Sequence, residues 1–245
     1  MALYQITISY DGTDFHGFQR QPNNRTVQGE IEHALMKLGW SGRTIISSGR
    51  TDTGVHAEGQ IAAFELDWNH SDEELAKALN FLFPVDISIN RAARAKAGFH
   101  PRYDAQFRKY RYQIYIGSTA ESLAERYHWR VWPEPSFELM NKAAKMICGD
   151  HDFSLYGKPP KKGGRTLRSI EFAEWEREKT RNKAFFQIKA NSFLYHMVRR
   201  ITFILVRVGQ GKVTMDTIIG SVNGVDNLPP GIAPAKGLFL EEIFY

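Results

Sequence analysis

The chain has 245 residues, of which 42% are hydrophobic and 24% are charged, an ordinary composition for a globular protein. This length allows one large domain or two small ones. The lone cysteine, Cys148, excludes an intramolecular disulfide, and no apolar run is long enough to span a bilayer. The first residues lack the charged and apolar regions of a signal peptide, so we expect a cytoplasmic protein with no membrane contact.

The formal net charge is +5 and the sequence pI is about 9.2, a mildly basic balance that indicates a polyanionic partner. Two stretches concentrate the basic residues. They are Arg91, Arg94, Lys96, Arg102, Arg108, Lys109 and Arg111 in the first, and Lys158, Lys161, Lys162, Arg165 and Arg168 in the second. A solvated face explains any single charge run, but two clusters, one of them interleaved with tyrosines, favour RNA or DNA.

The first half of the chain alternates strands and helices. Apolar and polar residues alternate over 3–10, Thr26 is a plausible N-cap, and Ser71 begins a capping-box pattern. We expect strands over 3–10, 45–46, 60–66 and 87–89, and helices that begin after Thr26 and Ser71. The resulting order, β, α, β, β, α, β, is that of a split βαβ or ferredoxin-like unit.

The second half repeats this plan. We expect strands over 108–116, 170–177, 184–190 and 236–240, and helices over 137–148, over 194–208 and after Thr214. The sequence therefore predicts an α/β (α+β) fold of two ferredoxin-like or RRM-like halves, 1–104 and 105–245. Their mixed, mostly antiparallel sheets would flank a central basic cleft, the kind of place where ligands usually bind.

One loop, 47–56, places polar and charged side chains between two glycines and between two extended segments. Asp52 is the one acid near these glycines, and Arg50 is two residues away. A carboxylate beside a guanidinium stays ionised, which suits a nucleophile or a base. The plainer alternative is a polar hairpin turn.

Two further residues deserve the same weighing. Tyr110 lies on an expected strand between Lys109 and Arg111, so it could stack on a base, although a core aromatic is the commoner case. Arg199 lies in an apolar helix, where it either meets a carboxylate or extends to solvent.

The eight histidines are scattered without HExxH or CxxC, and neither a P-loop nor G-x-G-x-x-G occurs. We therefore expect no metal and no nucleotide cofactor.

Several segments, spread over nearly the whole chain, together indicate a family. They are Tyr10-Asp11-Gly12-Thr13, Phe18-Gln19-Arg20-Gln21, Arg25-Thr26-Val27-Gln28-Gly29-Glu30, Gly49-Arg50-Thr51-Asp52-Thr53-Gly54-Val55-His56-Ala57, Lys109-Tyr110-Arg111-Tyr112, Phe193 with His196-Met197-Val198-Arg199, Val208-Gly209, and Ala233-Pro234-Ala235 with Gly237-Leu238. In these segments the chain resembles the TruA family of tRNA pseudouridine synthases.

The resemblance implies that Asp52 is the catalytic nucleophile, that Tyr110 packs on the target uracil, and that Arg199 pairs with Asp52. It implies that Arg20 helps to hold a flipped nucleotide. Further substrate contacts are expected at Arg50, Thr51, His56, Lys109 and Arg111. The implied substrate is uridine on the 3′ side of the anticodon arm of tRNA. The implied enzyme is a homodimer that needs neither metal nor organic cofactor.

The chemistry leaves alternatives open. The target base has to leave the stack before it can be modified, and Asp52 could then add either to C6 of the uracil or to the sugar carbon. A non-catalytic RNA-binding protein with paired RRM-like halves is the main rival, although it has no use for the loop around Asp52. A metal-dependent nuclease, with Asp52 as ligand and His56 as base, needs further carboxylates or histidines that the sequence does not offer.

Overall fold

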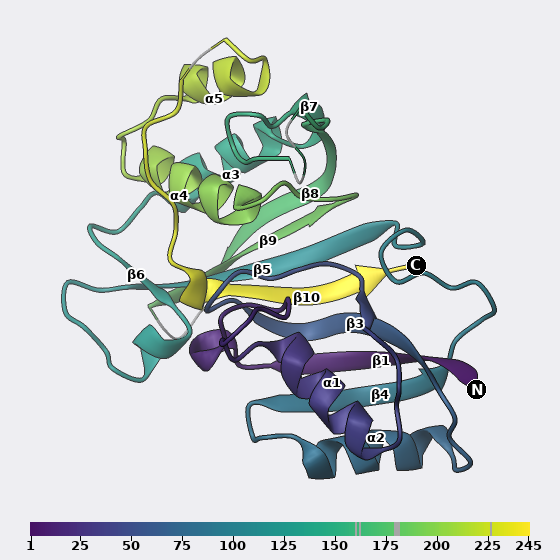
Figure 1. Ribbon diagram of the computed structural model, residues 1–245. Coiled ribbons are helices and arrows are strands. Elements are labelled where there is room, and N and C mark those ends of the chain that lie inside the picture. The colour runs from purple at the N-terminus through teal and green to yellow at the C-terminus, as the bar shows by residue number, and fades with distance from the viewer. Residues whose placement is uncertain (160, 162, 179–181, 226) are drawn as a thin grey trace. The chain divides into compact units, whose positions relative to one another are not determined.

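The structure is a computed structural model that describes residues 1–159, 161, 163–178, 182–225 and 227–245 (Figure 1). The chain forms two units, one of Met1–Gln106 together with Phe239–Tyr245, the other of Phe107–Leu238. We predicted halves of 1–104 and 105–245. The last strand, β10 (Leu238–Phe244), pairs in parallel with β3 (His56–Leu66), and this pairing joins Phe239–Tyr245 to the N-terminal unit.

The N-terminal unit has the predicted order of elements. They are β1 (Ala2–Tyr10), α1 (Val27–Lys37), β2 (Ile46–Ser47), β3 (His56–Leu66), α2 (Asp72–Leu82) and β4 (Ile87–Arg94). The strands lie in the order β4-β1-β3-β2, and each neighbouring pair is antiparallel. Strands β1 and β2 consequently run parallel with β3 between them, which is the predicted split βαβ arrangement.

Local sequence explains these elements. Every second residue of β1 is buried, among them Tyr4, Ile6 and Ile8 with no exposed surface, because alternate side chains of a strand point to one face. Thr26 caps α1 by accepting a hydrogen bond from the backbone N–H of Gly29, and the expected capping box of Ser71 is present at α2. Helices α1 and α2 pack together beside this sheet (Figure 1).

The C-terminal unit is a second α/β layer structure. Its elements are β5 (Phe107–Ile116), β6 (Trp129–Val131), α3 (Phe137–Met146), β7 (Gly149–Asp152), β8 (Leu167–Arg177), β9 (Lys183–Ala190), α4 (Met197–Gly209) and α5 (Met215–Val222). The antiparallel order is β5-β9-β8-β7, with β6 parallel to β5. Helix α3 packs on α4 and β8 (Figure 1). The predicted α/β class with mostly antiparallel sheets is confirmed in both units, while the cleft stays a prediction.

The differences from the predicted elements have local causes. Strands β6 and β7 are too short to show an alternating pattern. Helix α4 begins at Met197 rather than at 194, because His196 has φ 67°, a left-handed conformation that a right-handed helix cannot include. The last strand begins at Leu238 because the residues before it, Ala235–Gly237, form a 3₁₀ turn.

Candidate functional site

The loop that carries Asp52 is fixed by backbone hydrogen bonds to the segment that follows β1. The Phe18 N–H donates to the Thr51 carbonyl over 3.1 Å, and the Gly54 N–H donates to the Phe15 carbonyl over 3.3 Å. Within the loop, the Val55 N–H donates to the Asp52 carbonyl over 3.2 Å. The backbone is therefore tied on both sides of Asp52, whose side chain is half-buried.

Two glycines allow these backbones to approach so closely. A Cβ atom at Gly12 would lie 2.0 Å from the Val55 carbonyl oxygen, and one at Gly17 would lie 2.8 Å from that of Thr51. Gly17 also has φ +87°, which side chains disfavour. The loop 47–56, called the aspartate loop below, can therefore pack against this segment only because both positions are glycine.

Thr51 and Gln60 hold the loop from inside. The Thr51 side chain is 7% exposed, and its hydroxyl shares a hydrogen bond of 2.7 Å with the Tyr10 hydroxyl. The buried amide of Gln60 accepts from the Ser48 hydroxyl and donates to the Gly49 carbonyl over 3.2 Å. Because the Thr51 side chain points inward, we expect it to stabilise the loop. Its predicted contact with substrate remains a prediction.

His56 is also turned inward. Its side chain is 1% exposed, Nδ1 accepts from the Gly12 N–H over 3.0 Å, and the ring stacks on Phe239 with 4.5 Å between the centroids. The carboxylate of Asp11 is 3.1 Å from the same nitrogen. The imidazole therefore joins the beginning of β3 to the turn after β1. Arg50, by contrast, is exposed.

Arg20 is held by a buried carboxylate that sequence reasoning missed. Its Nη1 lies 2.7 Å from Oε2 of Glu32, which is 1% exposed. Glu32 also accepts from the Gln28 amide over 2.8 Å and from the Ile45 N–H over 3.1 Å. The sequence signal was an acid on the apolar face of the first helix, one turn after Gln28. A buried charge needs such partners, so Glu32 holds the guanidinium end of the Arg20 side chain in place.

A second ion pair supports the same segment. The Arg25 guanidinium donates to both carboxylate oxygens of Asp86, over 2.7 and 2.9 Å, and lies 4.2 Å above the Phe15 ring. The hydrogen bonds that Arg25 donates to Asp86 raise the pKa of Arg25. The Phe15 carbonyl accepts the hydrogen bond from the Gly54 N–H. The Arg25–Asp86 pair therefore supports the segment that holds the aspartate loop.

In the C-terminal unit, Tyr110 lies on β5 opposite Ile188 and is half-buried. Its ring meets that of Phe193 edge to face, with 5.2 Å between the centroids. Tyr112, two residues along the same face, is fully buried and donates to the Pro234 carbonyl over 2.7 Å. Burial raises the pKa of Tyr112 well above the usual range, so this hydroxyl stays protonated.

Lys109 and Arg111 project from the other face of β5. The pairing of β5 with β9 is regular from Arg108 to Tyr115, and side chains alternate along such a strand. The structure therefore does not bring these two cations to the face that carries Tyr110. Their contact with RNA remains a prediction.

Arg199 lies in the first turn of α4 and is bound to a segment that returns over the helix. Its Nε donates to the Ala233 carbonyl over 2.8 Å, and the Ala233 N–H donates to the Arg199 carbonyl over 3.2 Å. Arg200 donates to the carbonyls of Gly231 and Leu228. The bond from Nε holds the half-buried Arg199 side chain against this segment, and its pairing with a carboxylate remains a prediction.

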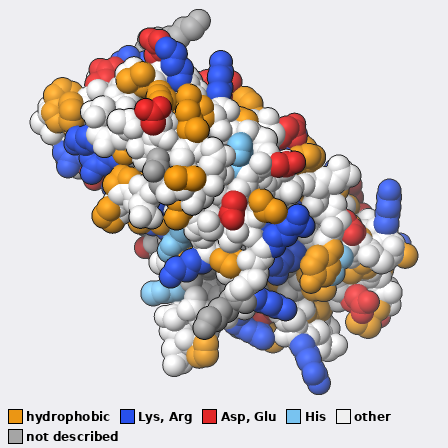
Figure 2. Space-filling view, turned by 90° about the horizontal axis from the view of Figure 1, so that it is seen from above, with side chains coloured by type: hydrophobic (Ala, Val, Ile, Leu, Met, Phe, Trp, Pro, Cys, Tyr) orange, Lys and Arg blue, Asp and Glu red, His pale blue; other side chains and the backbone are white. Residues whose placement is uncertain are grey.

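Basic side chains gather in groups on the face shown in Figure 2. In the cluster at 158–168, Lys158, Lys161 and Arg165 are exposed, and Arg168 turns to the carbonyls of Arg165 and Leu167. Lys162 lies outside the described residues.

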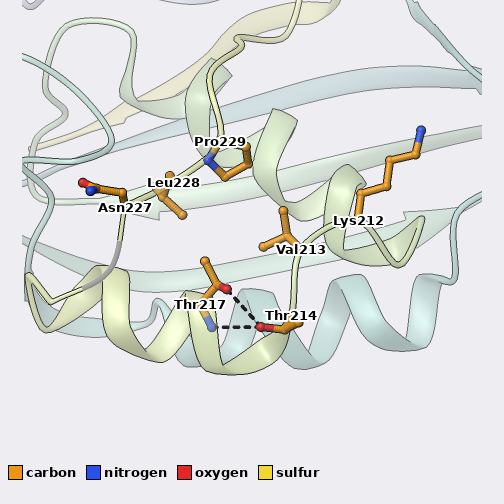
Figure 3. A pocket seen from close by; sticks show the side chains of 7 residues that line it. All are labelled: Lys212, Val213, Thr214, Thr217, Asn227, Leu228 and Pro229. Atoms are coloured by element: carbon orange, nitrogen blue, oxygen red, sulfur yellow. Dashed lines mark hydrogen bonds between the residues drawn. The ribbon is translucent and has the colours of Figure 1, made fainter.

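A shallow pocket of about 440 Å³ lies between the start of α5, with the connection that precedes it, and the segment 227–229 (Figure 3). Its lining includes Lys212 and the cap of α5, where the Thr214 hydroxyl accepts from the Thr217 N–H over 3.2 Å. The lining holds no carboxylate and no aromatic ring. Across the described part of the chain, no three His, Cys, Asp or Glu side chains group to hold a metal. No helix among the described residues could cross a membrane.

The chain is therefore an α/β protein whose motif residues sit on two tightly braced supports, Asp52 in one unit and Tyr110 and Arg199 in the other. The family model described as tRNA pseudouridine synthase matches residues 6–104 and 143–245. The tRNA pseudouridine synthase A of Limosilactobacillus reuteri is 35% identical over 249 residues, covering 100% of this chain and 97% of that protein. Those of Ruminiclostridium cellulolyticum and Listeria innocua are each 38% identical, with full coverage of both chains.

The chain belongs to the tRNA pseudouridine synthase family, as its motifs predicted, and it is an isomerase of that class. The residues matched by the family model include Asp52 and Arg199. Tyr110 lies in the unmatched interval between them, although the relatives align along the whole chain.

Proposed function

We propose that this protein converts uridine to pseudouridine on the 3′ side of the anticodon arm of tRNA, with Asp52 as the nucleophile. One observation carries the proposal. The Asp52 carboxylate is half-buried on a loop whose backbone is tied to a second segment on both sides of it. Such rigidity keeps the loop that carries the attacking oxygen in a fixed place, and correct positioning of the reacting groups lowers the barrier of a rearrangement.

The other motif residues take complementary roles in this proposal. The Arg199 guanidinium pairs with Asp52 and keeps it ionised. Tyr110 packs against the extruded uracil, and Arg20 holds the flipped nucleotide through its backbone phosphate. The hydrogen bond that holds Arg199, the half-buried ring of Tyr110 and the anchored guanidinium of Arg20 support these roles.

The reaction balances without a cofactor. The bond between N1 and the sugar carbon breaks, the uracil turns, and C5 bonds to the same carbon. The proton on C5 leaves and N1 acquires one, so substrate and product hold the same atoms. Asp52 adds to C6 or to the sugar carbon and departs again, and both routes return the free carboxylate. In this proposal Tyr110 takes the C5 proton, directly or through water.

The test is to measure pseudouridine formation in tRNA by wild type, Asp52→Asn and Asp52→Ala. We expect both variants to bind tRNA and to lose turnover, because neither amide nor methyl can act as the nucleophile. A normal rate in either variant would refute the assignment. Transcripts in which each uridine of the anticodon arm is replaced in turn by cytidine test the site of modification.

A variant that separates packing from proton transfer is Tyr110→Phe, which keeps the ring and removes the hydroxyl. We expect tRNA binding to persist while turnover falls, and unchanged turnover would leave Tyr110 as packing alone. We also propose a cytoplasmic homodimer that needs no metal. Light scattering tests the dimer, cell fractionation tests the compartment, and activity in excess chelator tests the metal. Abolition by chelator would favour the nuclease-like alternative for Asp52.

A further inference from the structure

The segment between β9 and α4 is a short, firmly held connection. At its beginning, the Asn191 carbonyl accepts from Nη1 of Arg108 over 2.7 Å. At its end, Tyr195 exchanges two backbone hydrogen bonds with Lys158, of 3.0 and 3.3 Å. A Cβ atom at Gly157 would lie 2.6 Å from the Tyr195 carbonyl oxygen, so glycine is needed for this approach. The side chains of the segment consequently have fixed directions.

Tyr195 presents an aromatic ring to solvent from this fixed backbone. Its side chain is 54% exposed, and the ring stacks on His196 with 3.7 Å between the centroids and 26° between the planes. His196 occupies the left-handed conformation that ends the segment. One face of the tyrosine ring is thus supported by a second ring, and the exposed surface lies on the side away from it.

The surroundings of this ring suit a nucleotide. Lys158, paired to Tyr195 through the backbone, is exposed and begins the basic cluster that continues with Lys161 and Arg165. Two residues before Tyr195, Phe193 packs against Tyr110. Two residues of chain span at most about 7 Å between Cα atoms. Tyr195 is therefore close enough to Phe193 along the backbone to reach a nucleotide next to one held at Tyr110.

We propose that Tyr195 is a stacking platform for an unpaired tRNA base beside the target uridine, with Lys158 on a nearby phosphate. Flat rings bind bases of any identity, and lysines bind phosphates, so this pair would hold the loop without reading its sequence. The inference rests on the proposed function for the choice of RNA. It extends that function by assigning a second nucleotide subsite, outside the reacting residues.

The test compares Tyr195→Ala and Tyr195→Phe with wild type, all carrying Asp52→Asn so that bound tRNA is not converted. Stacking on an aromatic residue contributes about 1–3 kcal/mol per base, so Tyr195→Ala should raise the Kd for tRNA about 5- to 150-fold, while Tyr195→Phe should bind normally. Phe81→Ala is the matched control. Phe81 is 89% exposed, on a helix whose first turn carries three acids, and its removal should leave Kd unchanged.

A direct readout of stacking is the fluorescence of 2-aminopurine placed at each nucleotide flanking the target. The fluorescence should be quenched on binding to the protein that keeps Tyr195 and to the Tyr195→Phe variant. It should not be quenched on binding to the Tyr195→Ala variant. An unchanged Kd in Tyr195→Ala, or equal weakening by Phe and Ala, would overturn the stacking role. Pseudouridine formation by the protein with Asp52 intact is measured separately. Its absence would overturn the proposed function, whereas the binding and fluorescence results decide the platform.

Discussion

Replacing Gly17 by alanine tests whether contact between two backbone segments positions the aspartate loop, 47–56. Gly17 has φ +87°, and its Cα faces the Thr51 carbonyl, one residue before Asp52. An added Cβ would lie 2.8 Å from that oxygen and 3.3 Å from the Asp52 carbonyl carbon. Neither atom belongs to a flexible side chain, so the loop itself has to move.

The structure sets the size of this movement. Ordinary contact begins at 3.4 Å, so the Cβ and the Thr51 oxygen must separate by about 0.6 Å, the difference between 3.4 Å and 2.8 Å. A misplacement of about 1 Å can cost about 100-fold in rate, so we expect Gly17→Ala to lower kcat about 10-fold or more. The left-handed conformation adds a loss of stability of about 1–2 kcal/mol.

Gly39→Ala is the control, because Gly39 has φ +88° and nothing within 4 Å of an added Cβ. It carries the same backbone cost without the contact to the loop. Urea unfolding and pseudouridine formation are measured on both variants. We expect both proteins to lose stability, and Gly17→Ala alone to lose turnover. Equal turnover in the two variants would show that the contact at Gly17 does not position Asp52.

Other variants probe the supports and the RNA surface. Glu32→Gln removes the negative charge opposite Arg20 and places an amide N–H group among the N–H groups that Glu32 accepts from. The free energy of unfolding in urea should therefore fall by about 1–3 kcal/mol. KM for tRNA should rise more than kcat falls, and a wild-type KM would contradict the role of this pair. Burial lowers the pKa of His128, so the unfolded chain protonates first on acidification and stability falls as the pH drops through about 6.5, the ordinary pKa of histidine, towards the lower pKa of the folded state. His128→Asn should flatten that fall, and an unchanged profile would assign it to other groups. Lys158→Gln with Lys161→Gln should weaken tRNA binding and lower the slope of log Kd against log salt concentration by about two; an unchanged slope would remove this cluster from the interface.

Local patterns predicted much of the fold because they act over a few residues. The caps at Thr26 and Ser71 need partners only three residues away, and both are present in the structure. The alternation of β1 needs only a sheet with one buried face. The polar loop around Asp52 was recognisable because glycines and hydroxyl residues interrupt two apolar segments, although its motif and not its composition indicated the chemistry.

The side-chain contacts that support the site could not be predicted from the sequence, because the residues that form them are far apart in the chain. Arg25 and Asp86 are separated by 61 residues, and neither has a pattern that indicates the other. Nothing in the sequence indicates that Arg20 and Ile45 surround Glu32, as they do in the structure. The left-handed residue at His196 was equally hidden, since histidine rarely adopts this conformation and the apolar pattern continues through it.

These supports differ in what they can tolerate, and that difference follows from their chemistry. The contacts of Gly12 and Gly17 with the aspartate loop involve backbone atoms, so no side chain can replace them without displacing the loop. The Arg25–Asp86 pair acts one step further away, through the Phe15 ring, and lies partly in solvent, where water screens charges. Loss of that pair would loosen the segment without forcing it to move. The position of Asp52 therefore depends more strongly on two glycines than on the ion pairs around them.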